Sequence, residues 1–180
     1  MIAVRTAEWT DAPGIAAVHV AAWRSTYAGI LPVGYLAGLS LNRQTGHYLM
    51  AMRRGVGVHV VTVSGDDLPT ASPHAKVVGF ATAQRHDPPA PYGEGEVETL
   101  YILDDWRDRG FGRQLMEASA AWLAERGCVS LFLWVLRDNP SRWFYQRIGG
   151  TAAAEQAIQV AGQQVVQTAY VWPEIGKLLA

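Results

Sequence analysis

The sequence predicts a mixed α/β fold, in which helices flank a central sheet whose strands are mostly antiparallel. The order along the chain is helices, then a meander of strands, then strand–helix–strand–helix–strand, which is typical of a mixed α/β domain. Residues 129–136 are nearly continuous in apolar side chains, as expected for a strand at the centre of a sheet. Because no repeat, low-complexity tract or long linker divides the chain, residues 1–180 are expected to form one domain.

The N-terminal segment predicts a short strand at residues 2–5, followed by a helix. Thr10 or Asp11 offers a side-chain oxygen that can cap the first helical amides. Pro13 fits the first turn, where its missing N–H leaves no bond unmade. The helix then carries an apolar stripe of Ile15, Val18 and Ala22.

The other elements follow from apolar periodicity, β-branched content and turn-forming residues. The first helix is expected to end at 30–32, and further helices are predicted in a region broken near 40 that runs to about 54, at 112–126 and between 139 and 150. Strands are predicted at 56–63, 77–84, 96–103 and 129–136, with two more between 152 and 172 that turn at 161–162. Loops are predicted at 64–76 and 86–95, and a charged turn at 104–109.

Composition narrows the function. With 49% hydrophobic and 17% charged residues and a net charge of −1, the chain is globular and is not expected to bind nucleic acid or membranes. Cys128 is the only cysteine, so neither an internal disulfide nor a thiolate zinc site is expected. The first residues do not look like a signal peptide, and no apolar run approaches the ~20 residues that cross a bilayer. The expected compartment is the cytoplasm.

The most informative segment, residues 96–112, is a strand, a glycine-containing turn and a helix start. Gly110 and Gly112 let the backbone approach a ligand closely. The first amides of the helix lack internal partners and lie at the positive end of its dipole, which suits a diphosphate. Positive charge is added by Arg107, Arg109 and Arg113. Since short glycine motifs recur by chance, a tight turn with solvated arginines is the alternative interpretation.

This segment resembles the acyl-coenzyme A signature of the GCN5-related N-acetyltransferases, the GNAT family. The signature is a strand of type L-Y-V, a short turn, then aromatic–[QR]-x-x-G-x-[GA] and a helix; it is matched here by Leu100-Tyr101-Ile102, Trp106, Arg107, Gly110 and Gly112. A second family element, an Asn followed by a helix with F-Y-x-x-x-G, is matched by Asn139, Phe144, Tyr145 and Gly149. Residues 23–32 are also similar to one branch of the family, so the resemblance spans nearly the whole chain.

Three positions depart from the family pattern. Asp104 stands where the family often has Pro, and Gly150 replaces an aromatic residue that often follows the helix. Asn139 lies six residues before Tyr145, where many members have seven, so Asp138 is the alternative for that position.

The resemblance implies the GNAT fold, in which the parallel strands 96–103 and 129–136 splay apart and leave a cleft for pantetheine. It also implies acetyl-coenzyme A as the cosubstrate, with the backbone around 100–102 polarising the thioester carbonyl. No metal is expected, since the five histidines lack metal-ligand spacing. The implied cofactor-binding residues are Leu100, Tyr101, Ile102, Arg107, Asp108, Arg109, Gly110, Phe111, Gly112, Arg113, Asn139 and Tyr145.

The catalytic prediction concerns two protons. An alkylammonium has a pKa near ~10.4, so an attacking amine must lose a proton first. Glu96 and Glu98 share one face of a strand, and their proximity would raise one pKa towards neutrality. Glu96 matches the carboxylate that serves as general base in some family members, and Glu98 is the second candidate; solvated surface carboxylates are the alternative. Tyr145 matches the family tyrosine that protonates the leaving thiolate, with a core tyrosine as the alternative.

The predicted function is acetyl-coenzyme A-dependent N-acetylation of a primary amine on a small molecule or a protein, by direct attack. The alternative is a non-catalytic acyl-coenzyme A-binding or sensing module with the same fold. A dinucleotide-binding oxidoreductase is disfavoured, because the glycine turn lacks the G-x-G-x-x-G spacing. The acceptor, the acyl-chain preference and the oligomeric state, including a homodimer, stay open. The first two helices and the loop at 86–95 are candidate walls of the acceptor pocket.

Overall fold

The strands form one seven-stranded sheet in the order β1-β2-β3-β4-β5-β7-β6. The computed structural model describes residues 1–65 and 75–180. Neighbouring strands are antiparallel except β4 and β5, which are parallel, as predicted. The strands are β1 (Ile2–Thr6), β2 (Gly57–Val63), β3 (Lys76–Ala90), β4 (Gly93–Ile102), β5 (Leu131–Leu136), β6 (Thr151–Val160) and β7 (Gln163–Trp172).

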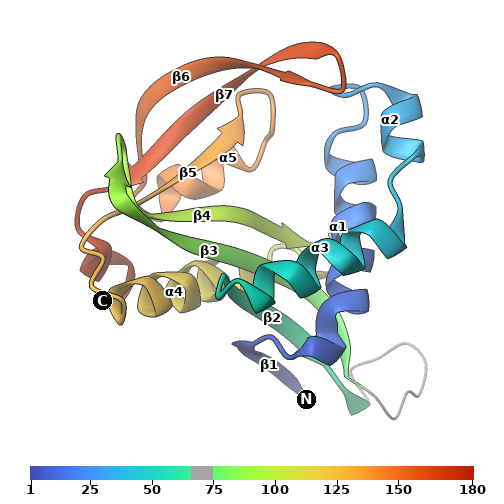
Figure 1. The fold of residues 1–180 in the computed structure, drawn as a ribbon, viewed down its shortest axis with the longest axis horizontal. Coiled ribbons are helices and arrows are strands. Elements are labelled where there is room, and N and C mark those ends of the chain that lie inside the picture. The colour runs from blue at the N-terminus through green and yellow to red at the C-terminus, as the bar shows by residue number, and fades with distance from the viewer. Residues whose placement is uncertain (66–74) are drawn as a thin grey trace.

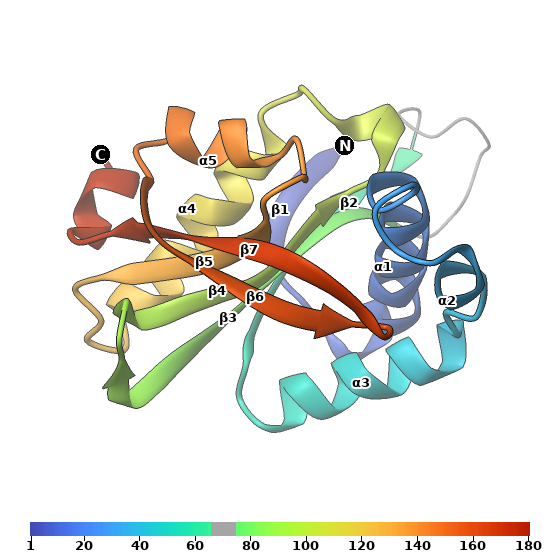
Figure 2. The same ribbon diagram turned by 90° about the horizontal axis from the view of Figure 1, so that it is seen from above.

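Helices cover both faces of the sheet (Figures 1 and 2). On one face, α1 (Ala12–Thr26) and α3 (Leu41–Arg53) bury apolar side chains against β2 and β3. On the other face, α4 (Phe111–Ala124) packs against β3, β4 and β5. The shorter helical elements are α2 (Val33–Ala37), α5 (Arg142–Arg147) and the 3-10 turns η1 (Trp9–Asp11), η3 (Asp104–Trp106) and η4 (Ile175–Leu178).

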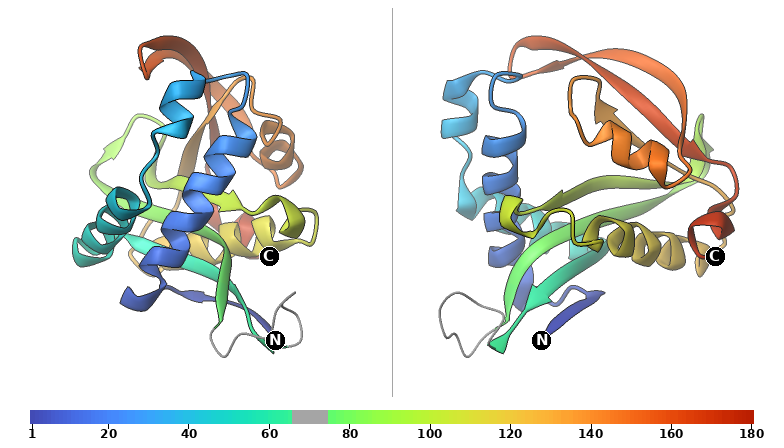
Figure 3. Two further views of the ribbon diagram at one scale, coloured as in Figure 1. Left: turned by 90° about the vertical axis from the view of Figure 1, so that its right-hand side faces the viewer. Right: turned by 180° about the vertical axis from the view of Figure 1, so that it is seen from behind.

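The long β6–β7 hairpin arches away from the sheet, and its tip lies beside α2 (Figure 3). Val160 and Val165, on either side of the turn, pack with Leu31 and Leu36. Because the hairpin reaches over α1 and α2, the C-terminal strands and the N-terminal helices enclose a common space. The expected turn at 161–162 is confirmed.

Of the two candidates for capping the N-terminal helix, Asp11 occupies the N-cap position of α1. The Asp11 side chain does not cap α1. Its carboxylate accepts hydrogen bonds from Arg5 at 2.7 and 3.0 Å and from the Glu8 amide at 2.7 Å, so its acceptors are engaged elsewhere.

Of the predicted loop at 64–76, residues 66–74 lie outside the described residues.

The predicted loop at 86–95 is wrong: β3 continues to Ala90, β4 begins at Gly93, and the two strands form a hairpin. Three prolines in this segment suggested a break; Pro88 and Pro89 lie in β3, and Pro91 lies in the turn that follows. However, β2 pairs with β3 only up to Gly57↔Ala83, so the part of β3 after Ala83 has no strand paired with it on the β2 side. Proline is tolerated there because no partner strand requires its missing N–H.

The parallel pair β4–β5 is short. Only Gly95↔Leu131 and Glu96↔Phe132 are paired, although both strands continue beyond these positions. On its other side, β4 pairs with β3 through Val97↔Ala83 and Thr99↔Thr82, which leaves Glu98 as an extra residue in a β-bulge. The fold therefore opens the centre of the sheet beside a bulged strand.

Candidate active site

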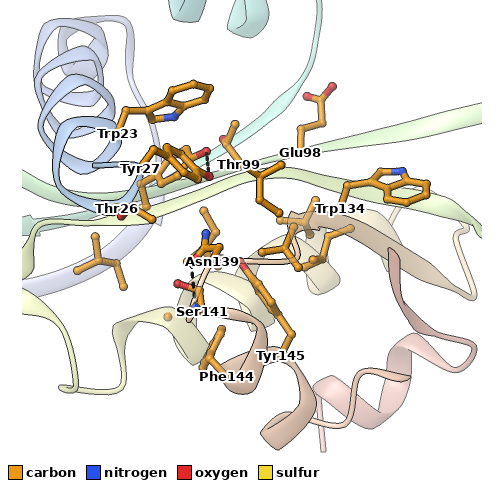
Figure 4. Close-up of a pocket in the computed structure, with 18 of the residues that line it drawn as sticks. Trp23, Thr26, Tyr27, Glu98, Thr99, Trp134, Asn139, Ser141, Phe144 and Tyr145 are labelled. Atoms are coloured by element: carbon orange, nitrogen blue, oxygen red, sulfur yellow. Dashed lines mark hydrogen bonds between the residues drawn. The ribbon is translucent and has the colours of Figure 1, made fainter. Parts of the chain in front are cut away.

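A cavity of about 520 Å³ lies where β4 and β5 part (Figure 4). One wall is the β4 segment from Val97 to Ile102, and the β5 segment from Leu133 to Leu136 faces it. Further walls come from α1, the turn before α4, α5 and the β6–β7 hairpin. The expected cleft between the two parallel strands is thus present.

The glycine turn forms one end of the cavity. Gly110, with a φ of 82°, is the N-terminal cap residue of α4, and no side chain caps this helix. The first helical bond runs from the Gln114 amide to the Gly110 carbonyl at 3.2 Å, so the preceding amides lie exposed at the positive helix end. A Cβ on Gly110 would meet no atom within 4 Å. The turn therefore offers amides and open space where an anion can bind.

The three arginines of this segment are more engaged than the sequence suggested. Arg107 forms an ion pair with Asp104 at 2.8 Å and donates to Thr26 at 3.0 Å, which ties the turn to α1. Arg113 pairs with Glu117 at 2.8 Å, one turn along α4. Arg107 and Arg113 line the cavity, whereas Arg109 stacks on Trp106 and does not. Part of the positive charge predicted here is therefore compensated.

Two further sequence-predicted residues also lie away from the cavity lining. The Phe111 side chain is buried in the core beneath α4. Glu96 hydrogen bonds through Oε2 to the His86 ring at 2.8 Å, and neither residue lines the cavity. The predicted cofactor residues that do line it are Leu100, Tyr101, Ile102, Arg107, Asp108, Gly110, Gly112, Arg113, Asn139 and Tyr145.

Of the two candidate base carboxylates, Glu98 lines the cavity. Although its side chain keeps solvent access, partial desolvation raises the pKa of Glu98, and the nearby Glu96 carboxylate raises it further. The charge of His86 acts in the opposite direction. Figure 4 shows the Glu98 carboxylate on the opposite side of the strands from Tyr145. The bulge therefore places a carboxylate with an elevated pKa at the far opening of the cavity.

Tyr145 reaches the cavity from α5. Its ring is held by contacts with Phe144, Tyr170 and Trp172, at centroid distances of 5.2, 6.1 and 6.5 Å. The side chain is 7% exposed, and in Figure 4 the hydroxyl points to the middle of the cavity. Burial raises the pKa of the Tyr145 hydroxyl, with a smaller contribution from Tyr27. The group therefore stays protonated at neutral pH and can donate a proton or a hydrogen bond.

Asn139 is buried in the lining, just before α5. Its Oδ1 accepts a hydrogen bond from the Ser141 amide at 2.9 Å, and Tyr27 is a further partner. Asp138, the sequence alternative, does not line the cavity and lies 3.9 Å from Arg137. The structure therefore brings Asn139, and not Asp138, to the cavity.

Several lining residues were not singled out from the sequence. Trp23 and Tyr27 both line the cavity, in agreement with the first helical region as a candidate wall of the acceptor pocket. The 86–95 segment contributes no lining residue. The lining residues that the sequence did not indicate include Thr26, Val97, Thr99, Trp134, Ile158, Val160 and Gln167. Thr26, Val97 and Thr99 lie in segments that resemble the family but are not motif positions, and the other four lie in β5 and the β6–β7 hairpin, where no motif marks them.

Comparison with known proteins agrees with this geometry. Residues 61–150 match the acetyltransferase (GNAT) family. The uncharacterized N-acetyltransferase YuaI of Bacillus subtilis is 31% identical over 178 residues, covering 99% of this chain and 96% of the relative. A GCN5-related N-acetyltransferase structure from Rhodopseudomonas palustris superposes with a TM-score of 0.69 at 21% identity, covering 94% of this chain and 93% of the other. The PaiA N-acetyltransferase of Thermoplasma acidophilum, solved with coenzyme A, gives 0.68 at 16% identity, covering 93% and 98%.

Within 1–65 and 75–180, no helix is long and apolar enough to cross a membrane. In the same part of the chain, no cluster of three or more His, Cys, Asp or Glu side chains has the arrangement of a metal site.

Proposed function

The chain belongs to the acetyltransferase (GNAT) family, and from that premise we propose that it transfers an acetyl group from acetyl-coenzyme A to a primary amine. The observation that carries the proposal is the cavity between β4 and β5. It has anion-binding amides at one end, a buried tyrosine hydroxyl inside and a carboxylate at the other opening.

The glycine turn would bind the diphosphate of the cosubstrate. The uncapped start of α4 supplies amides and a favourable helix dipole. Arg113 lies beside it, and Arg107 fixes the turn by joining Asp104 and Thr26. The apolar β4 and β5 walls suit the pantetheine arm. Beyond Glu96↔Phe132 the two strands no longer pair with each other, so β4 backbone groups on this side can bond a ligand.

Two groups would handle the protons of the reaction. Glu98 would receive the proton of the acceptor ammonium, directly or through water, so that the nitrogen can attack the thioester carbonyl. We place this role on Glu98 because it lines the cavity, while Glu96 is bonded to His86. Tyr145 would give a proton or a hydrogen bond to the sulfur as the C–S bond breaks. Direct attack requires no acyl-enzyme, and Cys128 is buried with a raised pKa.

A thiol-release assay tests the proposal. Purified protein is mixed with acetyl-coenzyme A and a panel of small amines, amino acids and peptides, and free thiol is measured with and without each amine. The proposal predicts release that depends on both protein and amine. Coenzyme A binding by calorimetry without amine-dependent release across the panel would contradict it and favour the non-catalytic module.

A further inference from the structure

The charged groups of the cavity are unevenly distributed. Arg107, Asp108 and Arg113 belong to the glycine turn and the first turn of α4, and Arg147 ends α5. Glu98 is the remaining charged residue of the lining, and it stands on the opposite side of the strands from α5 (Figure 4). The side of the cavity that contains Glu98, called the acceptor side below, therefore presents a single charge, which is negative.

Two indoles line the same cavity as this carboxylate. Figure 4 shows Trp23 on one side of Glu98 and Trp134 on the other, and both line the cavity. Trp23 stacks on His19 at 5.1 Å with an interplanar angle of 8°, while Tyr27 meets its edge at 4.9 Å. Trp134 meets Tyr92 edge to face at 5.3 Å and 90°. Neighbouring rings thus support both indoles, and both indoles line the cavity.

Aliphatic side chains add to the lining, which also contains the polar Thr99 and Gln167. Leu31 follows α1, and Ile158 and Val160 come from the β6–β7 hairpin. The indole Nε1 of Trp23 is buried and has no hydrogen-bond partner in the described residues, so that ring is held by packing. Flat apolar groups gain from burial against aromatic rings, and ammonium groups are attracted to indole faces.

This chemistry separates acceptor classes. A polyamine or aminoglycoside carries several charges, and burying each would require a further partner, yet this side of the lining offers one carboxylate. An amino acid would bring its own carboxylate near Glu98. A second cavity of about 610 Å³ shares Glu98 and Thr99 and is bordered by Arg54, Arg85 and Arg126, so an anionic acceptor would have to extend there.

We infer that the acceptor is a monoamine whose amino group is joined by a short chain to a flat, apolar ring, as in the arylalkylamines. Its ammonium lies beside Glu98 and its ring packs against Trp23 or Trp134. This inference rests on the proposed acetyl transfer, because that reaction requires an acceptor amine. It concerns the binding of that amine, so it can be tested without measuring turnover.

The test is calorimetry on protein saturated with coenzyme A, with four amines as probes. Phenethylamine is expected to bind tightest. Propylamine lacks the ring, spermidine adds charges, and phenylalanine adds a carboxylate; each is expected to bind more weakly. Trp23→Leu and Trp134→Leu, made separately and combined, remove the indoles. The combined variant should weaken phenethylamine about 3- to 10-fold or more and leave propylamine nearly unchanged. Trp9→Leu, at an exposed indole outside the cavity, is the matched control.

Several results would overturn the inference. They are undetectable phenethylamine binding, equal or tighter binding of propylamine or spermidine, and an unchanged phenethylamine affinity in the folded double variant. Tighter binding of phenylalanine would also overturn it and would point to Arg54, Arg85 and Arg126. Amine-dependent thiol release without this order of affinities would leave acetyl transfer standing and reject the acceptor class alone. The predicted order of affinities without thiol release would leave the acceptor class standing and reject acetyl transfer.

Discussion

The two ends of the cavity are built in different ways. The anion-binding end comes from one contiguous segment, residues 104–113, in which a 3-10 turn, a left-handed glycine and a helix start follow one another. The acceptor end is assembled from α1, the β4 bulge, β5 and the β6–β7 hairpin, which are far apart in sequence. A contiguous segment leaves a motif in the sequence, whereas an assembled wall does not. The sequence therefore predicts a coenzyme A site, while the proposed acceptor class is inferred only from the fold.

Tyr145 lies where the two ends meet, and its removal should have the largest effect on rate. Tyr145→Phe deletes one hydroxyl and keeps the ring contacts with Phe144, Tyr170 and Trp172. We expect kcat to fall by about 10²- to 10⁴-fold with little change in coenzyme A affinity. Steady-state kinetics and calorimetry measure the two quantities. Tyr35→Phe, at an exposed tyrosine, controls for the loss of a hydroxyl; full turnover in Tyr145→Phe with chemistry rate-limiting would remove the acid role.

Glu98 tests the acceptor end by its pH dependence. In the wild type, activity should fall as pH drops through the raised pKa of Glu98, because the base becomes protonated. In Glu98→Gln the loss should reach about 10²-fold or more just above the pKa of Glu98, where the wild-type carboxylate is ionised and most of the amine is protonated. The loss should shrink as pH rises further, since more of the amine arrives neutral. Glu96→Gln provides the comparison, because Glu96 bonds to His86 and does not line the cavity. A pH-dependent loss in Glu96→Gln together with an unchanged pH profile in Glu98→Gln would indicate that Glu96 is the general base.

A buried hydrogen bond supports the acceptor wall from behind. The His19 ring, which stacks on Trp23, bonds through Nδ1 to the Tyr48 hydroxyl at 2.6 Å. Tyr48→Phe leaves the His19 nitrogen without this partner and should lower the free energy of unfolding by about 1–3 kcal/mol. Urea denaturation measures the change, and Tyr35→Phe serves as the exposed control. Equal stability of wild type and Tyr48→Phe would mean that water replaces the bond.

Stability should also depend on pH through two buried histidines, His19 and His59. Burial lowers the pKa of His19 and of His59 to about 4, against ~6.5 in an unfolded chain. Between these values the unfolded state binds more protons, so stability should decrease as pH falls from about 6.5 to 4. Melting temperatures across this range measure the slope, and His59→Gln should make it shallower. An identical slope in wild type and variant would show that His59 does not contribute.

Much of the fold followed from local signals. The order of helices and strands and the C-terminal hairpin were predicted from periodicity and turn residues, the parallel pair from the resemblance to the GNAT family, and the glycine turn from its residues. The hairpin of β3 and β4 was missed because Pro88 and Pro89 read as a break, although they occupy a stretch of β3 that no outer strand pairs with. Whether proline is tolerated there depends on where a distant strand ends, which local sequence does not show.

The site shows the same limit at single residues. Alternation placed Glu96 and Glu98 together but could not reveal the bulge at Glu98 or the bond between Glu96 and His86. The arginine count predicted positive charge but not the partners that compensate it, such as Asp104 and Glu117. Both outcomes depend on register and on side-chain geometry, which a one-dimensional pattern does not encode.

The central claim is that the cavity between β4 and β5 binds coenzyme A with its diphosphate at the glycine turn, and a pair of glycine variants tests it most directly. Gly110 and Gly127 flank α4, with φ values of 82° and 83°, and a Cβ on either would meet no atom within 4 Å. Valine at each position should therefore cost a similar backbone strain, about 1–2 kcal/mol. Calorimetry should show that Gly110→Val no longer binds coenzyme A, while Gly127→Val binds it like the wild type. Equal affinity of the two folded variants would contradict the account.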